Sequence, residues 1–291
     1  MANLKEIRNR IASVGSTMQI TSAMKMVSAA KLKKAQGAIT QMRPYAEKLQ
    51  DILTNLSSTL DLSENAYSEN REVKNVLIVG ITSNRGLCGG FNNNVIKQVN
   101  NLVNNKYKKS NVKVLCLGKK IKDAFKNSSN YYITKELIEV EDIFNKLTFA
   151  NSSIIASNLM ESFINKKFDK VIFVYNSFIN AASQTVKTEQ LLPVSKPILA
   201  ENESIADYSF EPSKEEIVLD LIPKSLKIQL FKGLLDSYAS EHGARMTAMH
   251  KATDNAKEMK KSLTIGYNKA RQAAITSEIL EIVGGAEALK S

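Results

Sequence analysis

Small and hydrophobic residues recur in alternating steps of three and four over the first 60 residues, with mostly polar residues between them. The series comprises Leu4, Ile7, Ile11, Val14, Met18, Thr21, Lys25, Ser28, Leu32, Ala35, Ile39, Met42, Ala46, Leu49, Leu53, Leu56 and Leu60. A sustained repeat of about 3.5 residues is typical of a coiled-coil seam. Pro44 lies inside the series, so we expect a kink or a break there.

A second series of the same kind occupies the C-terminal part of the chain. It comprises Phe231, Leu235, Tyr238, His242, Arg245, Met249, Ala252, Ala256, Met259, Leu263, Gly266 and Ala270. No proline follows Pro223, which predicts a helix from about Lys224 to Val283. Two matching stripes at opposite ends of one chain cover each other most simply as an antiparallel pair, so we predict a coiled coil.

The apolar periodicity continues almost to the last residue. Ile275, Ile279 and Ile282 recur at helical spacing in ARQAAITSEILEIVGG, although chain ends are normally polar and frayed. This stripe predicts that some other surface covers the tail.

Between the two series the period changes. The segments Val73–Ser83, Val112–Gly118 and Lys170–Ile179 are short runs rich in Val, Ile and Leu, which predict buried strands. Gln184–Val194 predicts a further strand. Stretches of helical composition separate these runs, at about Asn94–Asn105, Lys119–Lys126 and Phe149–Lys167, and the alternation indicates a mostly parallel sheet with right-handed crossovers.

The predicted fold class is therefore α/β with a long antiparallel coiled coil. Discontinuous N- and C-terminal helices flank an inserted, Rossmann-like parallel α/β domain. The expected boundaries are residues 1–60 for the N-terminal helix, 73–195 for the α/β domain and 210–291 for the C-terminal helix.

The amino-acid composition agrees with a globular α/β protein that has a hydrophobic core. The chain has 291 residues, of which 43% are hydrophobic, enough for a globular core. No stretch approaches the roughly 20 apolar residues of a membrane span, and the charges after Met1 disfavour a signal peptide. Cys88 and Cys116 are too few for a disulfide framework and favour a reducing compartment.

The net charge of +11 is concentrated in the N-terminal series. Residues 1–57 carry nine basic side chains against three acidic ones, which keeps open a basic coiled coil that binds nucleic acid. Against this, Ile20–Leu32 has apolar or small residues around most of the helix and little charge, a pattern typical of a helix enclosed by protein.

The candidate for chemistry is SNRGLCGGFN, Ser83–Asn92, a glycine-rich turn between a predicted strand and a predicted helix. Phosphate-binding loops occupy such positions, so a nucleotide-binding α/β protein is a second alternative. The turn nevertheless lacks both G-x-x-x-x-G-K-[ST] and G-x-G-x-x-G. Cys88 has no nearby histidine as a base, because His242 and His250 fall on the C-terminal helix. We therefore expect no catalytic, cofactor or metal site.

Several long segments resemble, in order and over essentially the whole chain, the gamma subunit of the F-type ATP synthase. They are KEIRNRIASV, ITSAMKMVSAAKLKKAQ, RPYAE, SNRGLCGGFN, FINAASQ, QLLPV, SEHGARMTAMHKATDNA and YNKARQAAITSEILEIVGGAEAL. The resemblance implies a non-catalytic rotor. Its antiparallel coiled coil turns inside a hexamer of alpha and beta subunits, and the C-terminal tip is held in an apolar sleeve. Rotation would couple ion flow through the membrane c-ring to ATP synthesis or hydrolysis on the beta subunits.

The resemblance also implies roles for individual residues. Arg271 and Gln272 would hydrogen-bond a loop of a beta subunit, with Thr276 and Glu278 beside them and Ile275, Ile279 and Ile282 in the sleeve. Met24 and Lys25 would lie against the moving segment of the beta subunits, and Arg245 would belong to the same coupling region. Contacts with the c-ring and the epsilon subunit would involve Tyr208, Phe210 and Glu211.

The expected assembly is a hetero-oligomer with one copy of this chain, without cofactor, nucleic acid or membrane insertion. It would lie on the cytoplasmic face of a bacterial plasma (inner) membrane, since the chain shows no mitochondrial presequence. The insertion with a regulatory cysteine pair of plant chloroplast forms is also absent. Asn84 stands where the family usually has an acidic residue, so no charge-dependent role is expected there.

Overall fold

The computed structural model describes residues 4–59, 66–134, 143–194 and 214–288. The chain forms two compact units: the coil unit, Met1–Ser28 with Met246–Ser291, and the sheet unit, Ala29–Arg245. Two long helices contribute to both units, α1 (Leu4–Thr59) and α6 (Lys214–Ala288), and each unit is described by itself below.

Both long helices continue through a proline. Pro44 lies inside the 56 residues of α1, so the helix does not break there, and the alternative of a kink stays a prediction. Pro223 lies inside the 75 residues of α6, which begins ten residues before the predicted start. A proline removes one backbone N–H from the helix ladder. Pro44 is exposed, so water can hydrogen-bond the carbonyl that loses its partner.

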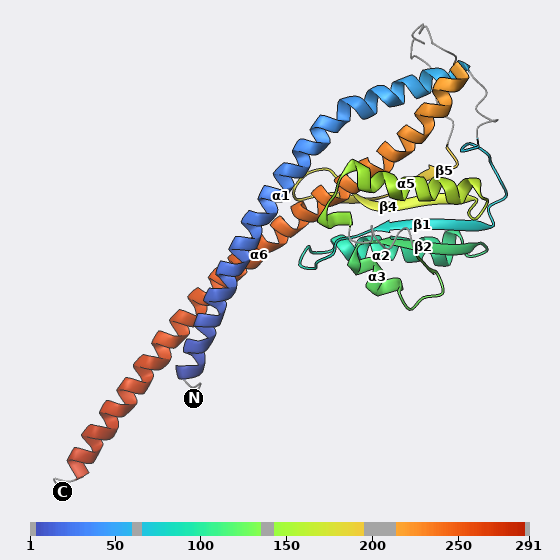
Figure 1. Cartoon of the computed structure of the whole chain (residues 1–291). Coiled ribbons are helices and arrows are strands. Elements are labelled where there is room, and N and C mark those ends of the chain that lie inside the picture. Colours follow the sequence, from blue (N-terminus) through green and yellow to red (C-terminus); the bar gives the residue numbers. More distant parts are fainter. Residues whose placement is uncertain (1–3, 60–65, 135–142, 195–213, 289–291) are drawn as a thin grey trace. The chain divides into compact units, whose positions relative to one another are not determined.

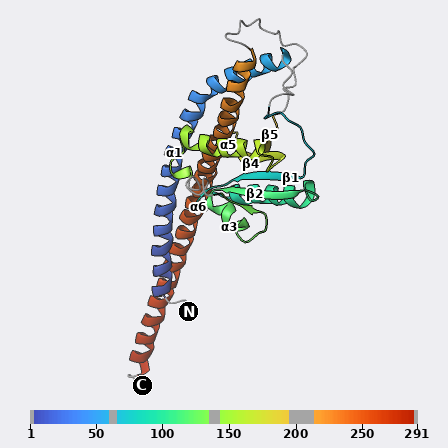
Figure 2. The ribbon, with the colours of Figure 1, turned by 45° about the vertical axis from the view of Figure 1, so that its right-hand side comes forward.

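In the coil unit, α1 and α6 pack antiparallel. The Thr21 and Thr253 hydroxyls share a hydrogen bond of 2.8 Å, and a Cβ on Gly15 would lie 3.6 Å from Lys260 Nζ. From Thr21 to Gly15 the chain of α1 runs back by six residues, while from Thr253 to Lys260 the chain of α6 runs forward by seven. The two helices therefore run in opposite directions. Figures 1 and 2 show the two segments side by side. In the coil unit the predicted seam of α1 is confirmed, because Ile7, Ile11, Val14, Met18 and Thr21 are half-buried or buried. Its last members, Leu53, Leu56 and Leu60, have side chains outside the described part of the chain.

The predicted seam of α6 is confirmed as far as Ala256 and again at Leu263 and Ala270, which are half-buried. Met259 is 55% exposed and Gly266 is exposed, whereas their neighbours Lys260 and Tyr267 are half-buried. At these two positions the seam therefore shifts by one residue. A helix of about 3.6 residues per turn drifts against a 3.5-residue repeat, and the aliphatic stem of a lysine covers apolar surface as well as a methionine does.

The sheet unit contains one five-stranded sheet of order β3-β2-β1-β4-β5. Its strands are β1 (Asn75–Ile81), β2 (Asn111–Leu117), β3 (Tyr131–Tyr132), β4 (Lys170–Phe178) and β5 (Gln184–Leu192). The first four are parallel, as the alternating pattern predicts. The fifth strand is antiparallel to β4, because the connection between them is too short for a crossover helix.

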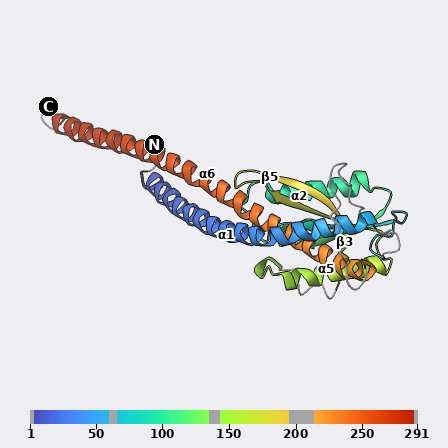
Figure 3. The same ribbon diagram turned by 90° about the horizontal axis from the view of Figure 1, so that it is seen from above.

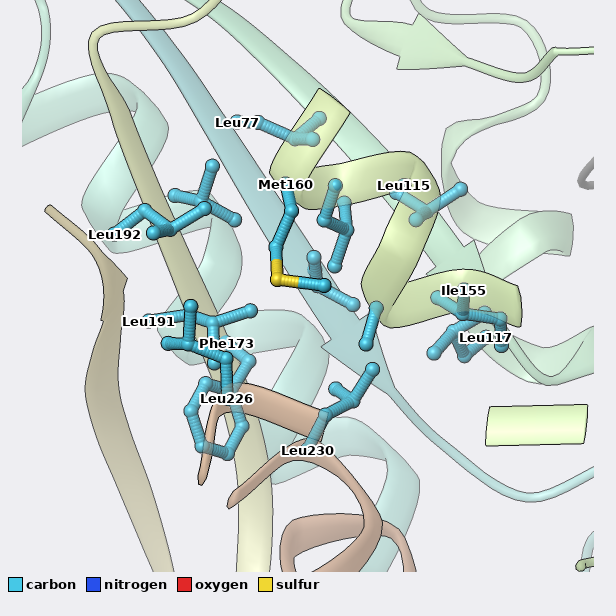
Figure 4. Close-up of a cluster of buried hydrophobic side chains, with 14 of the residues drawn as sticks. Leu77, Leu115, Leu117, Ile155, Met160, Phe173, Leu191, Leu192, Leu226 and Leu230 are labelled. Atoms are coloured by element: carbon cyan, nitrogen blue, oxygen red, sulfur yellow. The ribbon is translucent and has the colours of Figure 1, made fainter. Parts of the chain in front are cut away.

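Helices cover both faces of the sheet. One face packs against α2 (Phe91–Asn101) and α3 (Lys119–Phe125), and α2 continues as a π-helical turn, Leu102–Lys106. The other packs against α5 (Phe149–Ile164) and the sheet-unit part of α6. In Figure 4 Leu226 and Leu230 of α6 point into the cluster that contains Phe173 and Leu191. Gly233 permits this approach, since a Cβ there would lie 2.7 Å from the Phe173 ring.

The four predicted strands and the predicted helical stretches appear within a few residues of their expected positions, because continuous buried runs and amphipathic segments are local signals. Two short elements were not expected: β3, and a 3₁₀ turn at Ile143–Asn145. Among the described residues, no helix is long and apolar enough to cross a bilayer.

Candidate partner-binding surfaces

The C-terminal end of α6 extends beyond α1. Leu4 begins α1, and the spacing of the Gly15 and Thr21 contacts places the level of Leu4 close to Arg271 of α6. Figures 1 and 3 show the end of α6 continuing past the N-terminal end of α1. Residues 275–288 are exposed throughout. This overhanging segment, residues 272–288, is a single helix without a covering element in the described part of the chain.

The overhang carries a stripe of large apolar side chains. Ile275 and Ile279 are about half exposed and Ile282 is 71% exposed. Leu280 and Val283 are further exposed apolar side chains of the same segment. Their spacing of four and three residues aligns the three isoleucines along one side of the helix. Contiguous apolar surface of this kind marks a site for another protein, since water contact costs about 25 cal/mol per Å².

The polar residues predicted at this end are also on the surface. Arg271, Gln272 and Glu278 are exposed, and among the described residues neither Arg271 nor Glu278 has an ion-pair partner. The Thr276 hydroxyl donates to the Gln272 carbonyl of its own helix at 2.9 Å. Arg271 and Gln272 therefore keep their hydrogen-bonding groups available beside the apolar stripe.

A second apolar surface lies on the coil-unit part of α1. Ile20, Met26 and Val27 are each more than half exposed, whereas the predicted contact residues Met24 and Lys25 are half-buried. Lys25 lies on the seam and Met24 next to it. The exposed apolar side chains, which face away from the seam, agree with the interpretation of Ile20–Leu32 as a helix enclosed by protein.

The glycine-rich turn of the sheet unit is closed by its own hydrogen bonds. The Ser83 hydroxyl donates to the Arg85 carbonyl at 2.6 Å, and the Asn92 carboxamide accepts from Ser83 N at 3.0 Å and donates to Cys88 Sγ at 3.2 Å. Leu87 and Gly89 have φ values of +61° and +59°. The turn presents Arg85 and Leu87 to solvent and buries Cys88.

The buried thiol of Cys88 is not activated. Burial raises the pKa of Cys88, and no histidine among the described residues contacts it. Cys116 is also buried, and both cysteines are thiols rather than members of a disulfide. The described residues contain no cluster of His, Cys, Asp or Glu that could hold a metal ion.

Arg245 was predicted at a partner contact, yet its side chain lies inside the sheet unit and is only 8% exposed. Its guanidinium pairs with Glu241 at 2.6 Å and donates to the carbonyls of Arg85 and Gly86 in the glycine-rich turn. Sequence reasoning did not identify Glu241, although a Glu four residues before an Arg on one helix is a recognisable signal for an ion pair.

The charges around Arg245 are shaped by burial. Burial raises the pKa of Glu241 although Arg245 pulls it down. Burial, with the nearby positive charge of Arg245, lowers the pKa of His242 to about 3. His242 is therefore neutral near pH 7, and its Nδ1 lies 3.4 Å from Arg245 Nη1.

The predicted residues are thus distributed over three places. Arg271, Gln272, Ile275, Thr276, Glu278, Ile279 and Ile282 lie together at the end of α6. Met24 and Lys25 lie on the coil-unit part of α1, and Arg245 is buried in the sheet unit. Tyr208, Phe210 and Glu211 fall outside the described residues.

Comparison with known proteins places this arrangement in a family. Residues 3–289 match the family model described as ATP synthase. The chain is 62% identical to the ATP synthase gamma chain of Flavobacterium johnsoniae over 291 residues, with 99% of both chains covered. It is 60% identical to that of Christiangramia forsetii over 290 residues, again with 99% of both covered.

The chain belongs to the gamma-chain family of F-type ATP synthases. Its fold agrees with chains in solved structures of ATP synthases. A chain of the Euglena gracilis mitochondrial ATP synthase, in a structure of OSCP, F1 and c-ring, superposes with a TM-score of 0.64 at 20% identity, covering 98% of this chain and 94% of that one. A chain from the central stalk and c-ring of Tetrahymena thermophila ATP synthase gives 0.57 at 26% identity, covering 80% and 99%.

Membership of the gamma-chain family gives the overhang a consistent interpretation. A gamma chain is one subunit of a larger complex, and exposed apolar surface on a single subunit is what such a complex requires.

Proposed function

We propose that this chain is the rotor in the central stalk of an F-type ATP synthase. It transmits rotation between the membrane c-ring and the catalytic alpha/beta hexamer, and so couples ion translocation to ATP synthesis or hydrolysis. It has no active site of its own, because the nucleotide chemistry belongs to the beta subunits. One copy serves each complex, on the cytoplasmic face of the bacterial plasma (inner) membrane.

The overhanging apolar helix is the observation that carries this proposal. A single helix that exposes three aligned isoleucines needs an apolar sleeve, and no described element of the chain supplies one. Burying a large aliphatic side chain is worth about 1.5–3 kcal/mol. Three exposed isoleucines therefore provide several kcal/mol of binding free energy to a partner that encloses them.

Polar groups at the base of the overhang give this contact direction. Arg271 presents a planar guanidinium and Gln272 a carboxamide, which suit directed hydrogen bonds to carboxylates and backbone carbonyls of a beta-subunit loop. Thr276 and Glu278 add polar groups within two turns. Met24 and Lys25 contact the moving segment of a beta subunit farther along the coil.

The domain boundaries at residues 60, 73, 195 and 210 separate the coil from the domain that meets the membrane part. Within this proposal, Tyr208, Phe210 and Glu211 contact the c-ring and the epsilon subunit. Their substitution to alanine should weaken binding of the c-ring and leave the alpha/beta contact intact.

The proposal is tested by producing the alpha and beta subunits of the same organism with and without this chain. We expect one copy to co-elute with three of each partner in size-exclusion chromatography and to raise ATP turnover. Arg271→Ala should leave the stability of the isolated chain unchanged and reduce turnover of the complex, because the side chain has its partner in another subunit.

Substitution of the stripe provides the matched control. Changing Ile275, Ile279 and Ile282 together to Ser should weaken assembly, whereas Ser substitutions at the exposed Lys257 and Lys261 should not. Separate elution of the unmodified chain, with no effect on turnover, would remove the rotor proposal. Salt-dependent binding of nucleic acid, or nucleotide binding at Ser83–Asn92, would then be measured.

A further inference from the structure

We propose that Arg245 is a positioning residue that holds the glycine-rich turn on α6, and that it makes no direct contact with another subunit. It joins α6 to the turn that presents Arg85 and Leu87, so that turn and helix move together. The functional part of this inference rests on the proposed rotor function.

The hydrogen-bond inventory of the guanidinium leads to this inference. A guanidinium has five N–H groups. Arg245 Nη1 contacts Glu241 Oε1 at 2.6 Å and His242 Nδ1 at 3.4 Å. Nη2 donates to the carbonyls of Arg85 and Gly86 at 3.2 and 3.3 Å, and Nε donates to the Gly86 carbonyl at 3.4 Å. Each N–H thus has an acceptor within this chain, so none remains for a partner.

Burial supports the same conclusion. The side chains of Arg245 and Glu241 are 8% and 9% exposed, and they pair within one helix turn. Breaking such a pair is costly, because it leaves a charge without a partner in a poorly solvated place. His242 is buried beside them and neutral near pH 7, so its Nδ1 can accept from Arg245.

The carbonyls that accept hydrogen bonds from Arg245 belong to a turn with an unfavourable backbone conformation at Leu87. Leu87 has φ +61°, a backbone conformation that residues other than Gly, Asn and Asp rarely adopt, and its side chain is 63% exposed. A leucine exposed to this extent contributes little burial to offset the backbone cost. The anchor at Arg85 and Gly86, directly before Leu87, offsets it and fixes the direction in which both exposed side chains point.

Two further hydrogen bonds tie the same part of α6 to the sheet. The Ser240 hydroxyl donates to the Asn176 carbonyl at 3.0 Å, and Asn176 Nδ2 donates to the Phe91 carbonyl at 3.1 Å. Phe91 begins α2 immediately after the turn. The C-terminal end of the turn is therefore held through Asn176, which contacts both α2 and Ser240 of α6. The middle of the turn is held by Arg245, which is also a residue of α6.

Lysine cannot replace arginine in this role. Its three N–H groups radiate from one nitrogen atom, whereas the anchor needs donors that reach Glu241 on one side and two backbone carbonyls on the other. A direct ionic contact with an acidic partner would tolerate lysine far better. Arg245→Lys therefore separates a positioning role from a charge role.

The first experiment measures hydrogen–deuterium exchange of the full chain. Arg245→Lys should speed exchange of the amides at residues 84–90 by about tenfold or more, because hydrogen bonds to a charged group are lost there. Exchange in residues 4–28 and 250–288 should stay unchanged. Arg10→Lys, the same substitution at an exposed arginine of α1, is the control. Unchanged exchange at residues 84–90 in Arg245→Lys would overturn the proposal.

The second experiment measures ATP turnover of the complex with alpha and beta subunits in a double-mutant cycle. If Arg245 acts through the turn, Arg245→Lys should lower turnover in the unmodified background and have little further effect when Arg85 and Leu87 are both alanine. Additive losses, or no loss from Arg245→Lys, would overturn the functional part. Glu241→Gln, which keeps the side-chain shape, should show the same pattern more weakly if Arg245→Lys fails to fold.

Failure of the inference and failure of the proposed function remain distinct. The exchange experiment uses this chain alone and judges the anchor whatever the partners are. If the unmodified chain does not assemble with alpha and beta subunits, the rotor proposal fails. The hydrogen–deuterium exchange of residues 84–90 then still decides whether Arg245 anchors the turn.

Discussion

Gly118 is the position where a single methyl group should do the most damage. It lies between β2 and α3 with φ +106° and ψ 146°, a region that only glycine occupies without strain. A Cβ there would lie 2.1 Å from the Thr82 carbonyl oxygen and 2.8 Å from its carbon. These are backbone atoms, so no side-chain rotation relieves the clash.

The magnitude follows from two effects. The backbone conformation costs alanine about 1–3 kcal/mol, and the clash costs about 1–3 kcal/mol more as β1 moves away. The same movement strains the hydrogen bonds of 2.9 Å from Thr82 N to the Leu117 carbonyl and of 3.0 Å from Ile121 N to Thr82 Oγ1. We expect Gly118→Ala to lower the free energy of unfolding by about 2–6 kcal/mol, a large part of the usual 5–15 kcal/mol.

The assay is urea unfolding of the full chain, followed by circular dichroism. Gly37→Ala is the matched control, since Gly37 lies inside α1 with nothing within 4 Å of an added Cβ. Alanine is the better helix former by about 1 kcal/mol, so the control should raise the unfolding midpoint. A Gly118→Ala midpoint equal to or above that of the unmodified chain would refute the reasoning.

Two further predictions concern the sheet-unit part of α6. Leu235 is 5% exposed, so Leu235→Ala should lower the free energy of unfolding by about 2–5 kcal/mol, and an unchanged urea midpoint would show that this seam position is not packed. The pKa of His242 falls from 6.5 to about 3 on folding, so below pH 6.5 the unfolded chain binds a proton that the folded chain does not, and stability is lost as the pH falls. His242 alone should cost about 2 kcal/mol between pH 7 and pH 5, measured as the difference between the unmodified chain and His242→Gln, with the exposed His250→Gln as control; equal pH dependence of both variants would contradict a buried neutral His242.

Much of the fold is encoded locally, and for that reason it could be predicted. The strands β1, β2 and β4 are short runs rich in Val, Ile, Leu and Phe, because both faces of this sheet are covered. The seam of α1 was predictable because each seam residue repeats the same step over many turns. The apolar stripe at the end of α6 was likewise visible as a local period.

The candidate site residues also differ in how far the sequence could predict their surroundings. Exposed residues such as Arg271 were located by the motifs that the chain shares with its family, and they lie on the surface as a partner contact requires. Arg245 came from the same reasoning, yet its side chain is directed inward. Its partners, Arg85 and Gly86, are about 160 residues away in the chain, and their acceptors are backbone carbonyls, which no residue pattern reveals.

The sequence by itself determined the kind of structure: two helices with matching apolar seams, buried strands between them, and an apolar tail that needs a covering surface. Those properties depend on the order of residues within a few turns or one strand. Only the tertiary structure decided that α1 and α6 continue through Pro44 and Pro223, that the α6 seam shifts to Lys260, and that Arg245 binds the chain's own turn. The outcome depends on the surroundings of each proline, on how α1 and α6 face each other in the coil unit, and on acceptors distant in the chain, none of which local periodicity contains.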